Sequence, residues 1–185
     1  MTDLHQVFVN EGTFGLLVDG MIPVETADWS NGLVAPMSQG ALILTGINTG
    51  YVEASVTAQE SAPVGAPAES WDEIVEVSIR TQGGNLKLES LDLGPVTDAA
   101  LPLPPSASGW YRLRVHACGR ELLYDKTSME PVEKYLLTVW PGSETGSTVV
   151  RSSERIERAS QTQWTPPARE PAPAVDHNPP VRKAF

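Results

Sequence analysis

The sequence is poor in the residues that usually build metal and redox sites. It has one cysteine, Cys118, and three histidines, at positions 5, 116 and 177. One cysteine cannot form an intrachain disulfide or a cysteine-based zinc site, and the histidines lack the spacing of a His-Glu-x-x-His helix. We therefore expect no metal, no cofactor and a reducing compartment.

Long apolar runs and basic residues are also scarce. Apolar runs are only a few residues long, as in Ala41–Leu44, and the chain does not begin with a basic segment followed by an apolar one. We therefore expect no membrane association, no secretory signal and a cytoplasmic location. The 23 acidic and 13 basic residues give a formal net charge of −10, which disfavours direct binding to nucleic acid and favours a basic protein partner.

What the sequence does contain is a two-residue alternation of apolar side chains. The clearest case is 110–117, where Tyr111, Leu113, Val115 and Ala117 fall on one side of an extended chain. A period of two is typical of a strand with one buried face. The other expected strands are 4–9, 14–18, 41–45, 51–58, 71–80, 86–91 and 133–140.

Short strands separated by Gly- and Pro-containing turns, with no long helical period, predict an all-β fold. Connections too short for crossover helices favour antiparallel pairing, in a jelly-roll-like β-sandwich over residues 1–141. Asn10–Gly12 is expected to be the turn of a hairpin between the first two strands. Residues 142–185 lose the alternation, so we expect a flexible, Pro-rich tail with a short helix near 149–161.

The outer face of the 110–117 strand is the candidate binding site. Arg112, Arg114 and His116 alternate there with the apolar residues, and Arg120 follows shortly after. A row of guanidinium groups can hold the carboxylates or phosphates of a ligand. The alternative is cross-strand pairing with acids of neighbouring strands, which we favour in so acidic a chain. The acids expected to pair in this way are Glu76 and Glu133.

Two aromatic residues of the tail, Trp164 and Phe185, are further candidate binding residues. Trp164 lies in a polar, Pro-rich segment and Phe185 ends a short basic one. Aromatic side chains in such segments are typical anchors for a protein partner. No nucleophile motif accompanies His116, and the loop acids after residue 90 do not have the spacing of a calcium-binding loop. We therefore expect that the protein is not an enzyme.

Three parts of the sequence carry a shared pattern of Gly, Trp and strand residues. They are 29–46 (WxxGL, then GAxIxTG), 71–76 (WDExVE) and 109–141 (GWYRLRVHAxGR, then ExYLLxxWP). This pattern resembles small bacterial β-sandwich proteins of the competence nuclease inhibitor-like family and uncharacterised actinobacterial relatives. The resemblance covers residues 28–141 and implies an acidic β-protein that binds and blocks a nuclease. It assigns no inhibitory residue.

Charge, the lack of a catalytic motif and this resemblance lead to one expected function. We expect a non-enzymatic protein-binding module, an inhibitor or immunity-type partner of a basic protein such as a nuclease. The alternative is a structural or assembly component, of a phage particle or another multi-protein complex, that docks through its C-terminal tail. Removing the tail separates the two hypotheses, and the oligomeric state stays open.

Overall fold

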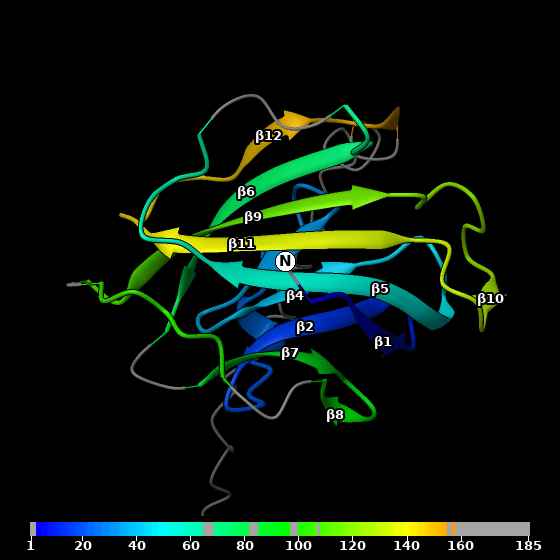
Figure 1. Cartoon of the computed structure of the whole chain (residues 1–185), viewed down its shortest axis with the longest axis horizontal. Helices are drawn as coiled ribbons and strands as arrows, with labels where there is room; N and C mark the ends of the chain where they lie inside the picture. The colour runs from blue at the N-terminus through cyan, green and yellow to red at the C-terminus, as the bar shows by residue number, and fades with distance from the viewer. Residues whose placement is uncertain are drawn as a thin grey trace, which may run out of the picture.

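The computed structural model describes residues 3–64, 69–81, 85–96, 100–106, 108–154 and 157, and these form two β-sheets (Figure 1). The first sheet has the order β1 (His5–Val9), β5 (Thr49–Ala58), β11 (Lys134–Pro141), β9 (Trp110–Cys118), β6 (Glu73–Arg80) and β12 (Thr148–Arg151), with β10 (Thr127–Ser128) also on β5. The second has the order β3 (Val34–Pro36), β4 (Ala41–Leu44), β2 (Thr13–Val18), β7 (Leu86–Ser90) and β8 (Gly94–Pro95).

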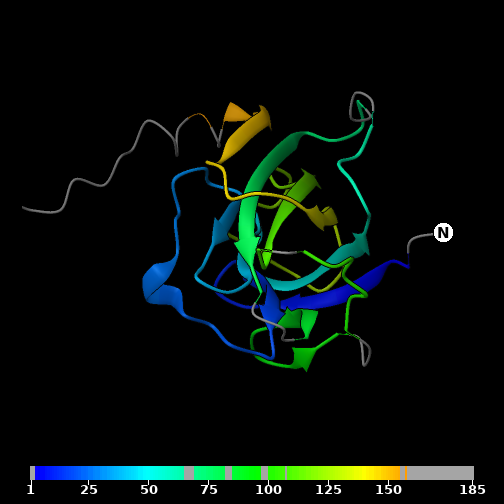
Figure 2. The same cartoon turned by 90° about the vertical axis from the view of Figure 1, so that its left-hand side faces the viewer.

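An all-β, sandwich-like fold is therefore confirmed. All eight strands expected from the alternation are present, with bounds shifted by up to two residues at either end. The connection that carries a short 3-10 turn, η1 (Val24–Thr26), lies outside the strands (Figure 2). Among the described residues, no helix has the length and apolar character needed to cross a membrane.

The core lies between the two sheets and follows the two-residue period. Tyr111, Leu113, Val115 and Ala117 of β9 are all buried in it. Phe14 from the other sheet meets the core too, as do the apolar side chains of the neighbouring strands. Full burial of one large aliphatic or aromatic side chain stabilises the folded state by about 1.5–3 kcal/mol. The hydrophobic effect therefore fixes the register of β9 and with it the direction of its polar residues.

The expected hairpin between the first two strands is not formed. Asn10–Gly12 does turn the chain, with Glu11 and Gly12 at φ of 52° and 70°, but the arms share only an isolated bridge between Asn10 and Thr13. Instead, β1 pairs along its whole length with β5, and β2 pairs with β4 and β7. The turn therefore carries the chain from one sheet to the other.

Pairing is mainly antiparallel, with one substantial exception. β11 runs parallel to β5, with Leu137 beside Val56, and antiparallel to β9, with Leu137 beside Val115. The short strand β10 is also parallel to β5. β11 enters between strands that are distant in sequence, so its direction relative to β5 is not set by a tight turn.

The first sheet extends beyond residue 141, where we expected the sandwich domain to end. The sheet continues through β12, where Thr148 lies opposite Glu76 and Val149 opposite Val75 of β6. β-branched residues suit such an edge position, and β12 satisfies backbone groups that β6 would otherwise leave open. We expected a helix near 149–161, but residues 149–151 are part of strand β12. The predicted start of the helix is therefore too early.

A helical hydrogen bond does follow β12, from the Glu157 N–H to the Ser153 carbonyl at 3.1 Å. The rest of the predicted tail lies outside the described residues, including Trp164 and Phe185. These two candidate binding residues therefore stay predictions.

Candidate functional site

The arginine row on β9 is paired internally. Arg114 forms a 2.5 Å ion pair with Glu76, its cross-strand neighbour on β6, and Arg112 approaches the same carboxylate at 3.5 Å. The side chains of Arg112, Arg114 and Glu76 are only 10%, 13% and 16% exposed. The guanidinium of Arg114 also lies over the Trp140 ring, 5.7 Å from its centroid. Cross-strand pairing, the alternative to a ligand site, is therefore what the structure shows for Glu76.

Arg112 has a second set of contacts beyond the sheet. Its guanidinium donates to the carbonyl oxygens of Thr145 and Gly146 at 3.2 and 3.4 Å, and to the Ser78 hydroxyl at 3.0 Å. These residues belong to β6 and to the segment that joins β11 to β12. Arg112 therefore positions that segment against the sheet.

His116 is buried on the same face. Its Nδ1 lies 3.2 Å from the Leu136 carbonyl oxygen, and its ring packs on Trp71 with centroids 5.5 Å apart. Burial, opposed by the contact with Leu136, lowers the pKa of His116 below its ordinary value of 6.5, and the charge of Arg114 lowers it further. His116 therefore stays neutral at neutral pH and packs as an aromatic residue.

This lowered pKa predicts a loss of stability on acidification. The unfolded chain takes up a proton at His116 near pH 6.5, whereas the folded chain resists protonation until lower pH. Stability is therefore lost as the pH falls through about 6.5. We expect the urea midpoint, measured by tryptophan fluorescence, to fall less between about pH 7.5 and 5.5 in His116→Gln than in the native protein. Equal falls in both proteins would contradict this role of His116.

Arg120 belongs to a buried polar network rather than to the row. Its guanidinium pairs with Glu73 at 2.5 Å and donates to the Gly32 carbonyl at 3.0 Å. The Ser153 hydroxyl donates to the other oxygen of Glu73. Burial opposes a charge on Arg120, but the charge of Glu73 and its hydrogen bond with Arg120 help to raise the pKa of Arg120 above its ordinary value. Arg120 thus joins β6, the chain before β3 and the chain after β12.

Glu133, which we expected to pair with an arginine, has different partners. Its carboxylate accepts hydrogen bonds from the amides of Gly46 and Ile47, at 2.9 and 2.5 Å, and from the Tyr135 hydroxyl. Burial and the charge of Glu133 raise the pKa of Tyr135 well above its ordinary value, so the phenol remains a donor. Glu133 therefore fixes the turn between β4 and β5, a structural task.

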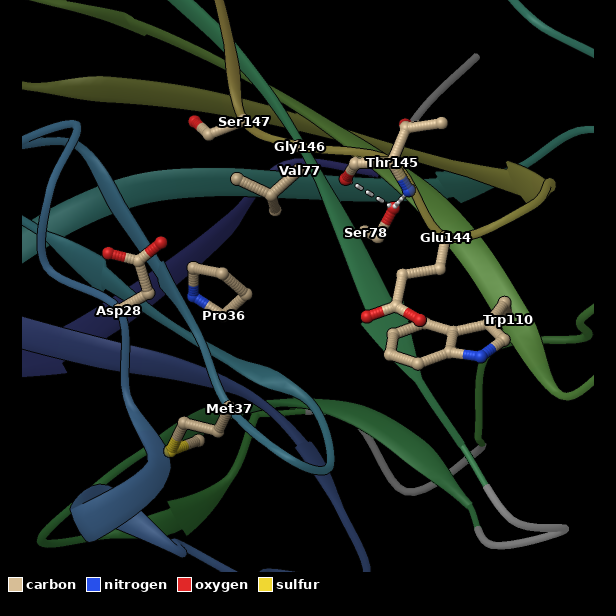
Figure 3. A pocket seen from close by; sticks show the side chains of 10 residues that line it. All are labelled: Asp28, Pro36, Met37, Val77, Ser78, Trp110, Glu144, Thr145, Gly146 and Ser147. Atoms are coloured by element: carbon tan, nitrogen blue, oxygen red, sulfur yellow. Dashed lines mark hydrogen bonds between the residues drawn. The ribbon is translucent and has the colours of Figure 1, made fainter.

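An open pocket lies beside β3 and β6, strands of different sheets (Figure 3). Its volume is about 460 Å³. One wall comes from β3 and the chain on both sides of it, the floor from β6 and β9, and the other wall from the segment between β11 and β12. The lining residues are Asp28, Pro36, Met37, Val77, Ser78, Trp110, Glu144, Thr145, Gly146 and Ser147.

The wall that carries Glu144 is held in place from both sheets. The Ser78 hydroxyl donates to the Thr145 carbonyl at 3.0 Å and accepts from the Thr145 amide at 2.8 Å, as Figure 3 shows. Asn31 lies just before β3 of the second sheet, and its buried side chain donates to the Ser147 hydroxyl at 3.2 Å. With the contacts of Arg112, these bonds preorganise the pocket and reduce the ordering cost of binding.

The chemistry of the pocket suits a cationic, partly apolar group. Carboxylates of Asp28 and Glu144 lie on opposite sides in Figure 3, and Trp110 supplies an aromatic ring. None of the ten described lining residues is basic, and neither carboxylate forms an ion pair within the described part of the chain. The Trp110 ring already attracts the guanidinium of Arg80, 5.8 Å from its centroid. A lysine or arginine side chain, with an apolar stem and charged head, matches this lining.

Sequence reasoning missed this pocket. Trp110 begins the most strongly alternating strand, in phase with the face opposite its core residues, and it is half-buried. Asp28 and Glu144 lie in irregular segments without a motif. Their proximity follows from the sheet topology, so no local pattern signals it. Among the described residues, no group of three or more His, Cys, Asp and Glu side chains could hold a metal ion.

No protein-family model and no curated protein matches the sequence. A solved structure described as crocagin biosynthetic gene J is similar at 18% sequence identity, with a TM-score of 0.47, over 77% of this chain and 99% of that chain. A similarity of this level does not bear on function.

Proposed function

We propose that this protein is a non-enzymatic binding module for a basic protein, and that the pocket takes a lysine or arginine side chain of that partner. The observation that carries the proposal is the pocket lining: Asp28, Glu144 and Trp110 on preorganised walls, with no basic residue among the described lining. A buried cation between two carboxylates and an aromatic ring is the kind of anchor that dominates protein interfaces.

Long-range charge supports the same partner. The net charge of −10 attracts a basic surface and speeds the encounter, and this attraction weakens as salt is added. Nucleases present basic surfaces to bind phosphates, so an acidic module seated there would exclude the substrate. We therefore propose inhibition of a nuclease, as an inhibitor or immunity-type partner, as the specific form of this function.

The test is capture and purification of the partner from host lysate at low salt, with the full chain and a chain truncated after residue 157. This cut keeps β12, which a cut at 141 would remove. We expect both forms to retain a basic protein and salt to release it. The activity of that protein should fall stoichiometrically when the module is added. A partner retained only with the tail present, or association indifferent to salt, would support the assembly hypothesis instead.

Substitutions in the pocket should weaken the complex measurably. We expect the double variant Asp28→Asn/Glu144→Gln to raise the Kd for the purified partner at least about tenfold, and Trp110→Ala to raise it about thirtyfold, because buried aromatic anchors contribute 2 kcal/mol or more. Isothermal titration calorimetry measures both values.

The matched control is Glu60→Gln/Glu69→Gln, which removes the same charge at exposed positions outside the pocket lining. An increase in Kd as large in the control as in Asp28→Asn/Glu144→Gln would show that net charge alone attracts the partner and would contradict the role of the pocket.

A further inference from the structure

The loop between β9 and β11, residues 119–133, exposes large apolar side chains. Leu122 is 68% exposed, Tyr124 57% and Met129 64%. The loop and β10 project beyond the end of the sheet in Figure 1. Scattered single apolar residues are common on surfaces, but several in one loop are a feature of interaction sites.

This loop is held firmly by the rest of the protein. The Gly119 amide donates to the Asp72 carboxylate at 2.9 Å, and the Asp125 amide donates to the Gly46 carbonyl at 2.8 Å. β10 then pairs with β5, where a side chain at Gly50 would overlap the Ser128 carbonyl. The apolar residues are therefore presented on a fixed backbone, which lowers the entropy that a partner must overcome on binding.

Acidic residues accompany the apolar ones and restrict what can cover them. Glu121, Asp125 and Glu130 are exposed in the same loop, against one exposed basic residue, Lys126. A second copy of this chain would bring two such acidic loops together, which like charges oppose. A partner with apolar residues and a basic border fits both features of the surface.

We propose that this loop is a second docking surface, which binds a basic amphipathic helix of a protein partner. Its apolar side chains would contact one face of the helix, and its carboxylates would meet lysine or arginine at the border. The pocket at Trp110 and this loop lie at opposite ends of β9, about 27 Å apart for a strand of this length. The surface is therefore independent of the pocket and goes beyond the function proposed above.

The test uses a fluorescent synthetic peptide of leucine and lysine with all leucines on one helical face, and a scrambled peptide of the same composition. Fluorescence anisotropy with the full chain should show tighter binding of the amphipathic peptide. The double variant Leu122→Ser/Met129→Ser should raise its Kd at least about tenfold. The matched control is Val24→Ser/Val64→Ser, which removes exposed apolar residues elsewhere and should leave the Kd unchanged.

Three outcomes would overturn the proposal. They are no binding of the amphipathic peptide, equal Kd values for the loop variant and the control variant, and self-association of the full chain that the loop substitutions abolish. The pocket variant Asp28→Asn/Glu144→Gln should bind the peptide as the Glu60→Gln/Glu69→Gln control does. The experiments can therefore contradict the binding role of the pocket and that of the loop separately.

Discussion

Replacing Arg120 with methionine is expected to lower the free energy of unfolding by about 3–5 kcal/mol. The change removes the ion-pair partner of Glu73, whose side chain is 2% exposed and would keep, among the described residues, the hydrogen bond from the Ser153 hydroxyl. It also removes the donor to the Gly32 carbonyl. A buried carboxylate that has lost its cation destabilises the folded state far more than an unpaired carboxylate exposed to water. Because the free energy of unfolding of a small domain is about 5–15 kcal/mol, this single substitution removes a large fraction of it.

Urea denaturation followed by tryptophan fluorescence measures the loss, and two further variants interpret it. Arg120→Met/Glu73→Leu should recover at least half of the stability, because both buried charges are then gone. Lys134→Met removes the 58% exposed partner of Glu53 and should cost less than about 1 kcal/mol. A loss for Arg120→Met as small as that for Lys134→Met would contradict the structural role of the network.

Most of the fold could be predicted because one physical rule acts along the whole chain. Strands with one buried face repeat apolar residues every second position, and Tyr111, Leu113 and Val115 lie in the core as that rule requires. The rule fails for strands too short to show a period, such as β3 and β12. The period of two also does not predict the order of strands in a sheet, so we did not predict the parallel pairing of β5 with β11.

The partners of the buried charges illustrate the same limit. Glu73 is in phase with Val75 on the core face of β6, and Glu133 is in phase with Tyr135 before β11. An acid in phase with a buried face signals a buried polar partner. Which partner it meets depends on strand order and loops, so Arg120 pairs with Glu73 and not with Glu133.

Of the expected binding row, Arg112 stands nearest to the pocket, though not as a ligand residue. Its contacts with Thr145 and Gly146 hold the wall that carries Glu144. The alternation therefore located a residue that supports the pocket, whereas Asp28 and Glu144 come together only through tertiary structure. The lining of a pocket cannot be predicted from local patterns when irregular segments distant in the sequence assemble it.

Replacing Glu133 with leucine is expected to destabilise the protein by about 3–4 kcal/mol, because unsatisfied buried donors cost about 1–3 kcal/mol each. The amides of Gly46 and Ile47 would lose their acceptor, and the Tyr135 hydroxyl would keep the more distant Leu44 carbonyl at 3.5 Å. Gly46 cannot move away easily, since a side chain there would already overlap the Arg120 carbonyl. The turn is therefore too tightly packed to find other acceptors.

Two substitutions separate the contributions to this loss in the same urea titrations. Glu133→Gln keeps one acceptor oxygen and should cost about 1–2 kcal/mol, while Tyr135→Phe removes one donor and should cost about 1 kcal/mol. If Glu133→Leu were neutral, apolar packing would compensate fully for the lost acceptor. The carboxylate would then not be what holds the β4–β5 turn. We expect the loss of stability to be largest for Glu133→Leu, smaller for Glu133→Gln and smallest for Tyr135→Phe. That order would show that the buried carboxylate of Glu133 joins the β4–β5 turn to the start of β11.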